Sequence, residues 1–260
     1  HLQSVAFPGQ AIGRTILGPP ERVSTFARED LLRFIDAHYG APRMVVSAAG
    51  AVNHKDLVAQ VEEKFTNLRH SQGDGREAAR YIGGETRERR ELEQAHLVLG
   101  FESVPYGHDD YFATQVFSTI LGGGMSSRLF QEVREKRGLA YTVFSFVHAY
   151  LDCGMFGVYT GTSGKDISEA AKVIADEVRG VASGISEVEI VRARAQHKAA
   201  ILMSLESSSA RCEHLARQLL IYGRAMPTSE MMQRIDAVDA AAPRSEEHTS
   251  ELQSRETISY

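Results

Sequence analysis

The sequence predicts an α+β fold in which antiparallel sheets are backed by helices. Short apolar runs, rich in β-branched and aromatic residues as strands are, lie among amphipathic stretches typical of helices. The two kinds of segment do not alternate strictly, which argues against a parallel sheet built from strand–helix–strand units. The chain has 260 residues, of which 43% are hydrophobic and 24% charged, so we expect one large or two modest globular domains.

The first part of the chain, residues 1–70, combines a loop, two helices and one strand. Residues 1–23 are rich in Gly and Pro and predict a loop. Apolar residues recur at helical spacing over residues 31–39, whereas the β-branched run 44–48 predicts a short strand. Asn53 is a residue type that caps helices, so we expect a helix to follow it.

Residues 71–92 are polar and charged and predict a linker, with an extended edge segment near Arg87–Leu92. A second unit is expected over residues 93–243. Its apolar runs predict three strands, at residues 95–101, 141–149 and 155–160. Its amphipathic runs predict six helices, at residues 109–121, 126–135, 167–182, 186–205, 210–222 and 229–238; Ser186 and Glu189 form a capping-box pattern at the start of the fourth.

The last stretch, residues 244–260, is predicted not to belong to the natural protein. Residues 244–254 resemble the translation of a common sequencing adapter, and residues 258–260 resemble the same adapter after a short barcode. Such a segment is excluded from fold reasoning. Because it holds only three larger apolar side chains, we expect it to be exposed and to pack on nothing.

Composition excludes several classes of function. A net charge of -5 gives no electrostatic reason to expect nucleic-acid binding. No apolar run reaches the roughly 18 residues of a membrane helix, and His1 begins no secretory signal, so we expect no membrane association and a cytoplasmic location. Two cysteines, Cys153 and Cys212, cannot form a disulfide framework. His1 is also no initiator Met, so we expect the chain to begin inside a longer protein.

Motifs for metal and nucleotide chemistry are also weak. None of the ten histidines has a second His and a Glu at the spacing of a helical zinc site, so we expect no metal ligand in this chain. Gly161–Lys165 imitates a phosphate loop, but Tyr159 stands where its first Gly should be. Cys153 has no neighbouring base in the sequence and is expected to fill a strand turn.

The most informative stretch runs from Leu121 to Phe146. It consists of a glycine turn, Gly122, Gly123 and Gly124, then a basic amphipathic helix, a stop at Gly138 and an aromatic strand. Periodicity alone favours an ordinary helix–turn–strand unit with solvated charges.

This stretch resembles the pitrilysin-like (M16) zinc metallopeptidases, in their bacterial processing-peptidase-like branch. The similarity rests on Gly-Gly-Gly-Met-Ser-Ser-Arg-Leu-Phe at residues 122–130 and Arg-Glu-Lys-Arg-Gly-Leu-Ala-Tyr at residues 134–141. The resemblance implies that residues 1–70 end a zinc-bearing domain and that residues 93–243 form most of a second, homologous domain. The family's zinc ligands would precede His1. Zinc would therefore belong to the full-length parent, and this chain would bind none.

The resemblance also implies a substrate-binding site. Arg134 and Tyr141 match an Arg and a Tyr that hold substrate near the zinc, and Gly122–Gly124 match a turn associated with substrate handling. We expect Leu129, Phe130 and Val133 to face the sheet and to leave the Arg134 guanidinium free. The alternative is that Arg134 pairs with Glu135 while Tyr141 merely packs.

The function implied is that of a zinc endopeptidase acting on peptides or unfolded polypeptides, to which this chain supplies the substrate-holding domain. The chain alone is expected to be inactive and to form a dimer or pair with the missing catalytic half. The alternative is a fragment of a zinc-less, non-catalytic partner subunit of the same fold.

Overall fold

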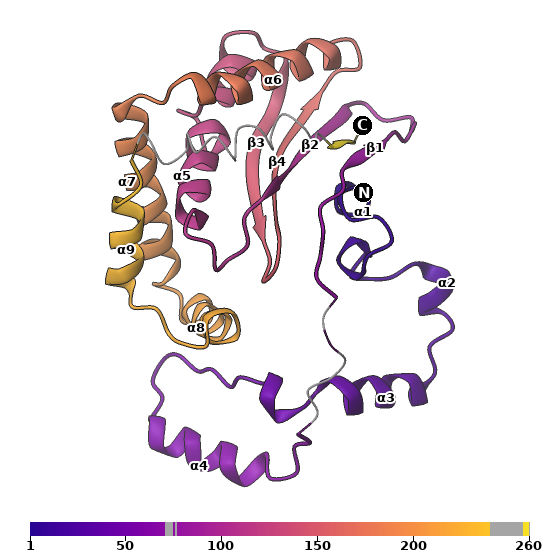
Figure 1. Cartoon of the computed structure of the whole chain (residues 1–260), viewed down its shortest axis with the longest axis vertical. Helices are drawn as coiled ribbons and strands as arrows, with labels where there is room; N and C mark the ends of the chain where they lie inside the picture. The colour runs from indigo at the N-terminus through magenta and orange to yellow at the C-terminus, as the bar shows by residue number, and fades with distance from the viewer. Residues whose placement is uncertain (71–74, 76, 240–256, 260) are drawn as a thin grey trace. The chain divides into compact units, whose positions relative to one another are not determined.

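The computed structural model describes residues 1–70, 75, 77–239 and 257–259. The chain folds into two compact units (Figure 1). The sheet unit contains His1–Arg14, Ala79–Ala200 and Thr228–Tyr260, and the helical unit contains Thr15–Ala78 and Ile201–Pro227. Each unit is thus assembled from separate stretches of the chain.

The sheet unit is built on three long antiparallel strands, as the sequence predicts. They are β2 (Ala95–Ser103), β3 (Ala140–Ala149) and β4 (Gly154–Thr162), with β4 between the other two. Two short strands, β1 (Gly84–Thr86) and β5 (Thr257–Ser259), extend the sheet in the order β1-β5-β2-β4-β3. The α+β class with an antiparallel sheet and helices is therefore confirmed.

One face of the three-stranded sheet is packed against helices, and α5 (Tyr111–Gly122) runs beside β3 (Figure 1). Further helices of this unit are α6 (Ile167–Ser183), α9 (Thr228–Asp236) and most of α7 (Glu187–Ser204). Alternate strand residues and helix residues are buried as the core of this unit: Leu97, Leu99, Phe101, Val143, Phe156, Val158, Val116, Ile120 and Ile174. Their burial contributes apolar stabilisation to this unit.

The other face is partly covered by the amino-terminal segment, which was predicted to be a loop but contains the short helix α1 (Leu2–Ala6). Phe7 is fully buried and meets the Tyr81 ring edge-on at 5.7 Å. Both belong to a cluster with Cys153 and Met155. The loop prediction failed because this segment is ordered by distant tertiary contacts, which Gly and Pro content does not report.

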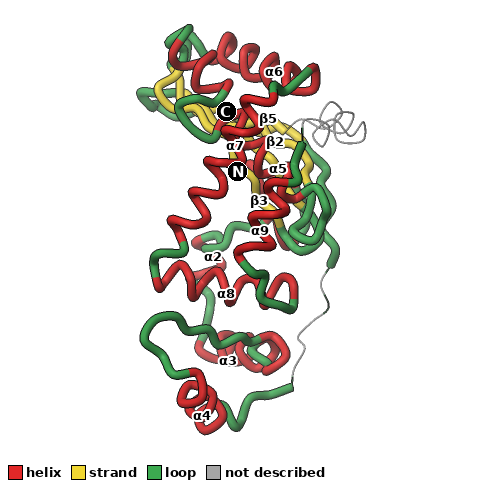
Figure 2. The backbone as a smooth tube through the Cα atoms, turned by 90° about the vertical axis from the view of Figure 1, so that its left-hand side faces the viewer, coloured by secondary structure: helices red, strands yellow, loops and turns green. Residues whose placement is uncertain are grey.

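The helical unit contains α2 (Pro20–Val23), α3 (Arg28–His38), α4 (His54–Lys64) and α8 (Ser208–Tyr222). Asn53 caps α4 as predicted, since its side chain accepts hydrogen bonds from the Lys55 and Asp56 amides. The strand predicted over residues 44–48 is not formed. A ladder needs a partner strand, and the described part of the helical unit contains only helices and loops (Figure 2).

The expectation that residues 244–260 pack on nothing is wrong for Thr257–Ser259. These residues form β5, whose main chain pairs with Gly84–Thr86 on one side and Val98–Gly100 on the other. A ladder is made by backbone groups, so a segment poor in apolar side chains can still occupy an open strand edge. The remainder of that stretch lies outside the described residues.

Candidate functional site

The glycine turn begins where α5 reaches the sheet. Gly122 is buried against β3, and a Cβ atom there would lie 2.3 Å from the Ser145 amide nitrogen. Two hydrogen bonds fix the same crossing: the Ser118 and Ser145 hydroxyls lie 2.9 Å apart, and the Ser145 hydroxyl donates to the Ser118 carbonyl at 2.7 Å. Only glycine permits this approach of helix and strand.

The segment after the turn is wider than the α-helix that the sequence predicts. Phe130–Glu135 forms a π-helix, with the Lys136 amide donating to the Gln131 carbonyl at 2.9 Å. Leu129 and Val133 are fully buried as expected, whereas Phe130 is only half-buried. Single π-turns of this kind often occur at functional sites. Gly138, with φ 60°, then reverses the chain into β3.

Tyr141 lies at an irregularity of β3. Ala140 pairs with Thr162 and Thr142 with Gly161, so Tyr141 is an extra residue opposite no residue of β4. A bulge of this kind re-aims the side chain that it carries. Tyr141 is 73% exposed, which leaves its ring and hydroxyl accessible.

Arg134 meets Tyr141 directly across the turn at Gly138, but its guanidinium is not free. The carbon Cζ lies 4.7 Å from the centre of the Phe130 ring and 4.5 Å from that of Tyr141. Nη1 donates to the Tyr141 carbonyl at 3.1 Å, and Nε lies 3.7 Å from a Glu135 oxygen. The expectation of a free guanidinium is wrong, and the Glu135 pairing of the alternative is present. Phe130, one helical turn earlier, is only half-buried and lies against the guanidinium instead of facing the core.

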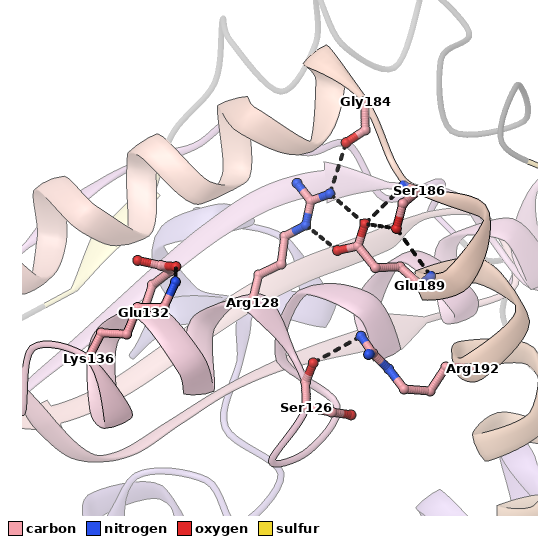
Figure 3. Close-up of polar contacts among 8 residues, drawn as sticks. All are labelled: Ser126, Arg128, Glu132, Lys136, Gly184, Ser186, Glu189 and Arg192. Carbon is pink, nitrogen blue, oxygen red and sulfur yellow. Dashed lines mark hydrogen bonds and ion pairs between the residues drawn. The ribbon is translucent and has the colours of Figure 1, made fainter.

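Three residues of α7 contact the stretch 123–128, which includes the end of the glycine turn; Figure 3 shows two of these contacts. Arg128 forms two hydrogen bonds with Glu189, at 2.6 and 2.9 Å. Arg192 donates to the Ser126 carbonyl at 3.0 Å. Beyond the part drawn there, Gln196 donates to the Gly123 carbonyl at 2.6 Å. Their spacing of three and four residues places Glu189, Arg192 and Gln196 on one face of α7.

The sequence did not predict these contacts of α7. The capping box was predicted and is confirmed, because Glu189 accepts hydrogen bonds from the amide and hydroxyl of Ser186. Its second role depends on a long-range contact with Arg128, which spacing along the chain does not reveal. The only available signal was the recurrence of three long polar side chains on one face of α7.

Ion pairs and burial shift the pKa values of the acidic side chains around this segment. Hydrogen bonds from Arg128 lower the pKa of Glu189 to about 2, and those from Lys136 and Arg137 lower the pKa of Glu132. Burial, with help from the Glu132 charge, raises the pKa of Glu177 instead. The π-helix therefore carries a paired acid at neutral pH, and its cations are not all free to bind a ligand.

A metal does not fit the residues that the structure describes. Within that part of the chain, no three His, Cys, Asp or Glu side chains come together as potential ligands, and zinc needs about that number. No helix within the same residues is long and apolar enough to cross a membrane.

The fold and this site define a peptidase-like domain. Residues 25–197 match the family model described as the peptidase M16 inactive domain. The chain belongs to the peptidase M16 family, which confirms the resemblance seen in the sequence.

Relatives in this family are named as proteases or protease subunits. The chain is 36% identical to a zinc protease of Rickettsia felis, over 91% of this chain and 58% of the relative. It is 38% identical to a probable mitochondrial-processing peptidase subunit beta of Arabidopsis thaliana, over 93% of this chain and 48% of the relative. The chain thus spans about half the length of these relatives.

A solved structure is similar to the whole fold. A chain of complex III2 from Candida albicans, with Inz-5 bound, matches 99% of this chain with a TM-score of 0.89 and 25% sequence identity. The matched region is 64% of that chain.

Proposed function

We propose that this chain supplies the substrate-holding domain of a zinc-dependent endopeptidase that cleaves peptides or extended polypeptides. Its family and its relatives, which include zinc proteases and processing-peptidase subunits, support this proposal. The observation that carries it is the Arg134 guanidinium, which lies over two aromatic rings, those of Phe130 and of the exposed Tyr141.

This arrangement suits the binding of a peptide main chain. The guanidinium has five N–H donors, and its side chain is 34% exposed, so donors remain for a substrate carbonyl or carboxylate. The two rings hold the guanidinium plane in place, which lowers the entropy that binding would cost. The Tyr141 hydroxyl can add a further hydrogen bond.

Gly122–Gly124 belong to the same proposal. Gly123 and Gly124 are exposed and carry no side chains, so an extended peptide can approach their backbone closely. The hydrogen bond from Gln196 to the Gly123 carbonyl keeps this backbone in one position.

The chemical step would belong to the parent protein. Zinc would be held by residues other than those described here and would polarise the scissile carbonyl and activate water. We expect this chain alone to be inactive and to act as a dimer or paired with a catalytic domain. A cytoplasmic location is part of the same proposal.

Binding to an unstructured fluorescein-labelled peptide with one central Phe tests the proposal. Arg134→Ala should weaken binding about tenfold, since it removes a charged donor. Tyr141→Phe should weaken it less. Arg90→Ala, which removes an exposed arginine paired with Glu88, is the matched control and should bind like the unchanged chain. A chain that binds no peptide, or binds it equally well without Arg134, would overturn the proposal.

In the parent enzyme the same substitutions should reduce turnover at unchanged zinc content. Losing both hydrogen bonds should cost about 2–4 kcal/mol of transition-state stabilisation. Kinetics unchanged in both variants would contradict the roles of Arg134 and Tyr141.

The alternative is a zinc-less partner subunit of the same fold. We keep this alternative because a chain of complex III2 has a similar fold. The coding sequence that precedes His1 separates the two functions: a His-x-x-Glu-His motif supports the peptidase, and its absence supports the partner subunit.

A further inference from the structure

The turn between α5 and the π-helix, residues 123–126, is exposed, yet each of its four backbone carbonyls accepts a hydrogen bond. Three of these bonds come from long side chains and one from a backbone amide: Gln196 to Gly123 at 2.6 Å, Ser127 amide to Gly124 at 3.0 Å, Gln131 to Met125 at 2.7 Å and Arg192 to Ser126 at 3.0 Å. The chain itself therefore supplies a donor to every carbonyl of the turn.

The backbone N–H groups of the turn are not matched in the same way. The first of them, at Gly123, donates to the Thr119 carbonyl at 3.1 Å and ends α5. Among the residues that the structure describes, the next three N–H groups, at Gly124, Met125 and Ser126, have no acceptor. The exposed surface of the turn thus offers three successive donors beside carbonyls that are already bonded.

Arg192 adds a positive charge to this surface. Its side chain is exposed on α7, and its Nη2 donates to the Ser126 carbonyl (Figure 3). Within the described part of the chain, its guanidinium has no carboxylate partner, whereas the neighbouring Arg128 is paired with Glu189. One bond to Ser126 leaves most of the five N–H donors of Arg192 for a ligand.

The residue that follows the turn carries a further unmatched polar group. Ser127 is only 3% exposed, and its hydroxyl has no hydrogen-bond partner among the described residues. A buried hydroxyl without a partner costs free energy and is uncommon in folded proteins. Polar groups that can donate therefore outnumber the acceptors that the chain supplies around this turn.

We propose that Gly124–Ser126 and Arg192 together bind a carboxylate group of a polypeptide. The proposal rests on the proposed function and names the chemical group that this turn recognises. Successive backbone N–H groups are a common means of binding anions. A neutral carbonyl could accept from the N–H groups, but only an anion compensates the unpaired charge of Arg192. A carboxylate has two oxygens, so it can accept from the turn and from Arg192 at once.

A terminal carboxylate and an acidic side chain share this chemistry, and three labelled forms of one unstructured peptide distinguish them by fluorescence anisotropy. The first form ends in a free carboxylate, the second in an amide, and the third is amidated but carries one central Glu. The free-acid form should bind about tenfold more tightly than the amide form. Either result for the Glu form supports the site: tight binding adds acidic side chains to its ligands, and weak binding restricts it to the chain terminus.

Substitutions of Arg192 test its part in this preference. Arg192→Gln should remove the preference for the free-acid form while keeping the affinity for the amide form, and Arg192→Lys should retain part of it. Arg89→Gln is the matched control, because Arg89 is also exposed and without an acidic partner among the described residues, and it should keep the full preference. In nitrogen–proton correlation spectra, the amide signals of residues 124–126 should shift with the free-acid form and not with the amide form.

The outcomes separate this inference from the proposed function. Arg134→Ala should weaken all three forms equally and leave their ratios unchanged. Equal binding of the free-acid and amide forms, or a preference that survives Arg192→Gln, overturns the carboxylate site while peptide binding stands. A preference that Arg89→Gln reduces as much as Arg192→Gln reflects net charge alone and also overturns the site. Binding of none of the peptides overturns both proposals.

Discussion

The Arg128 guanidinium and the Glu189 carboxylate meet in a two-bond ion pair, Nε to Oε1 at 2.6 Å and Nη2 to Oε2 at 2.9 Å. The same Nη2 donates to the Gly184 carbonyl at 2.8 Å, and Glu189 also accepts from Ser186. One carboxylate therefore caps α7 and ties it to Arg128, four residues beyond the glycine turn. Because both side chains are about four-fifths buried, this pair is worth more than an exposed one.

The pair predicts a loss of stability in acid. The pKa of Glu189 is about 2 in the folded chain against an ordinary 4.5, so its contribution is complete above about pH 4.5 and is lost as the pH falls toward 2. At pH 7, Glu189→Gln should lower the free energy of unfolding by about 2 kcal/mol. The difference from the unchanged chain should shrink between pH 4.5 and 2.

Urea unfolding at several pH values measures this effect. Glu187→Gln is the matched control on the same helical turn, since that carboxylate is 70% exposed and lies 3.7 Å from Arg194. It should change stability by less than about 0.5 kcal/mol. An unchanged acid response in Glu189→Gln would show that the ion pair does not stabilise the fold.

Gln196→Ala should loosen the glycine turn without unfolding the sheet. The substitution removes the donor to the Gly123 carbonyl, at 2.6 Å, while α7 keeps its own backbone hydrogen bonds. Amide hydrogen exchange should become faster at residues 123–126 and stay unchanged in β2 and β4. Gln233→Ala on the exposed face of α9 is the control. Equal amide protection of residues 123–126 in both variants would show that the Gln196 side chain does not hold the Gly123 carbonyl.

Gly122→Ala should destabilise the chain by about 2–4 kcal/mol. The added methyl group would meet backbone and side chain of Ser145, at 2.3 and 2.7 Å, and neither can move without shifting β3. Gly180→Ala in α6 has nothing within 4 Å of the new methyl group and should stabilise by about 0.5–1 kcal/mol. Thermal unfolding compares the two variants. Equal melting temperatures would contradict the close approach of α5 and β3 at Gly122.

Cys153 should resist alkylation far longer than Cys212. Burial, together with the nearby Asp152 carboxylate, raises the pKa of Cys153 to about 12, so almost no thiolate exists at pH 8. Cys212 is only partly buried, although its thiol donates to the Ser47 carbonyl. Mass spectrometry after timed iodoacetamide treatment should find Cys212 modified first, and early labelling of Cys153 would contradict its burial.

Local signals predicted much of the fold. The strands β2, β3 and β4 and the helix caps at Asn53 and Ser186 follow from short apolar runs and capping residues, which act within a few residues. The prediction of a strand over residues 44–48 failed because strand pairing is not a local property. Its apolar run satisfies the local pattern, but pairing depends on a partner that no local pattern supplies.

The sequence by itself determined the family, the three long strands and the neighbourhood of Arg134 and Tyr141, because motifs and short-range spacing carry that information. Only the tertiary structure decided that the rings of Phe130 and Tyr141 both lie against the Arg134 guanidinium, and that α7 binds the stretch 123–128 through Glu189, Arg192 and Gln196. It also brought His96 and Phe144 onto one face. These relations include contacts between residues 61 to 73 positions apart. They depend on a π-turn, a bulge and long-range packing, which chain-local propensities do not encode.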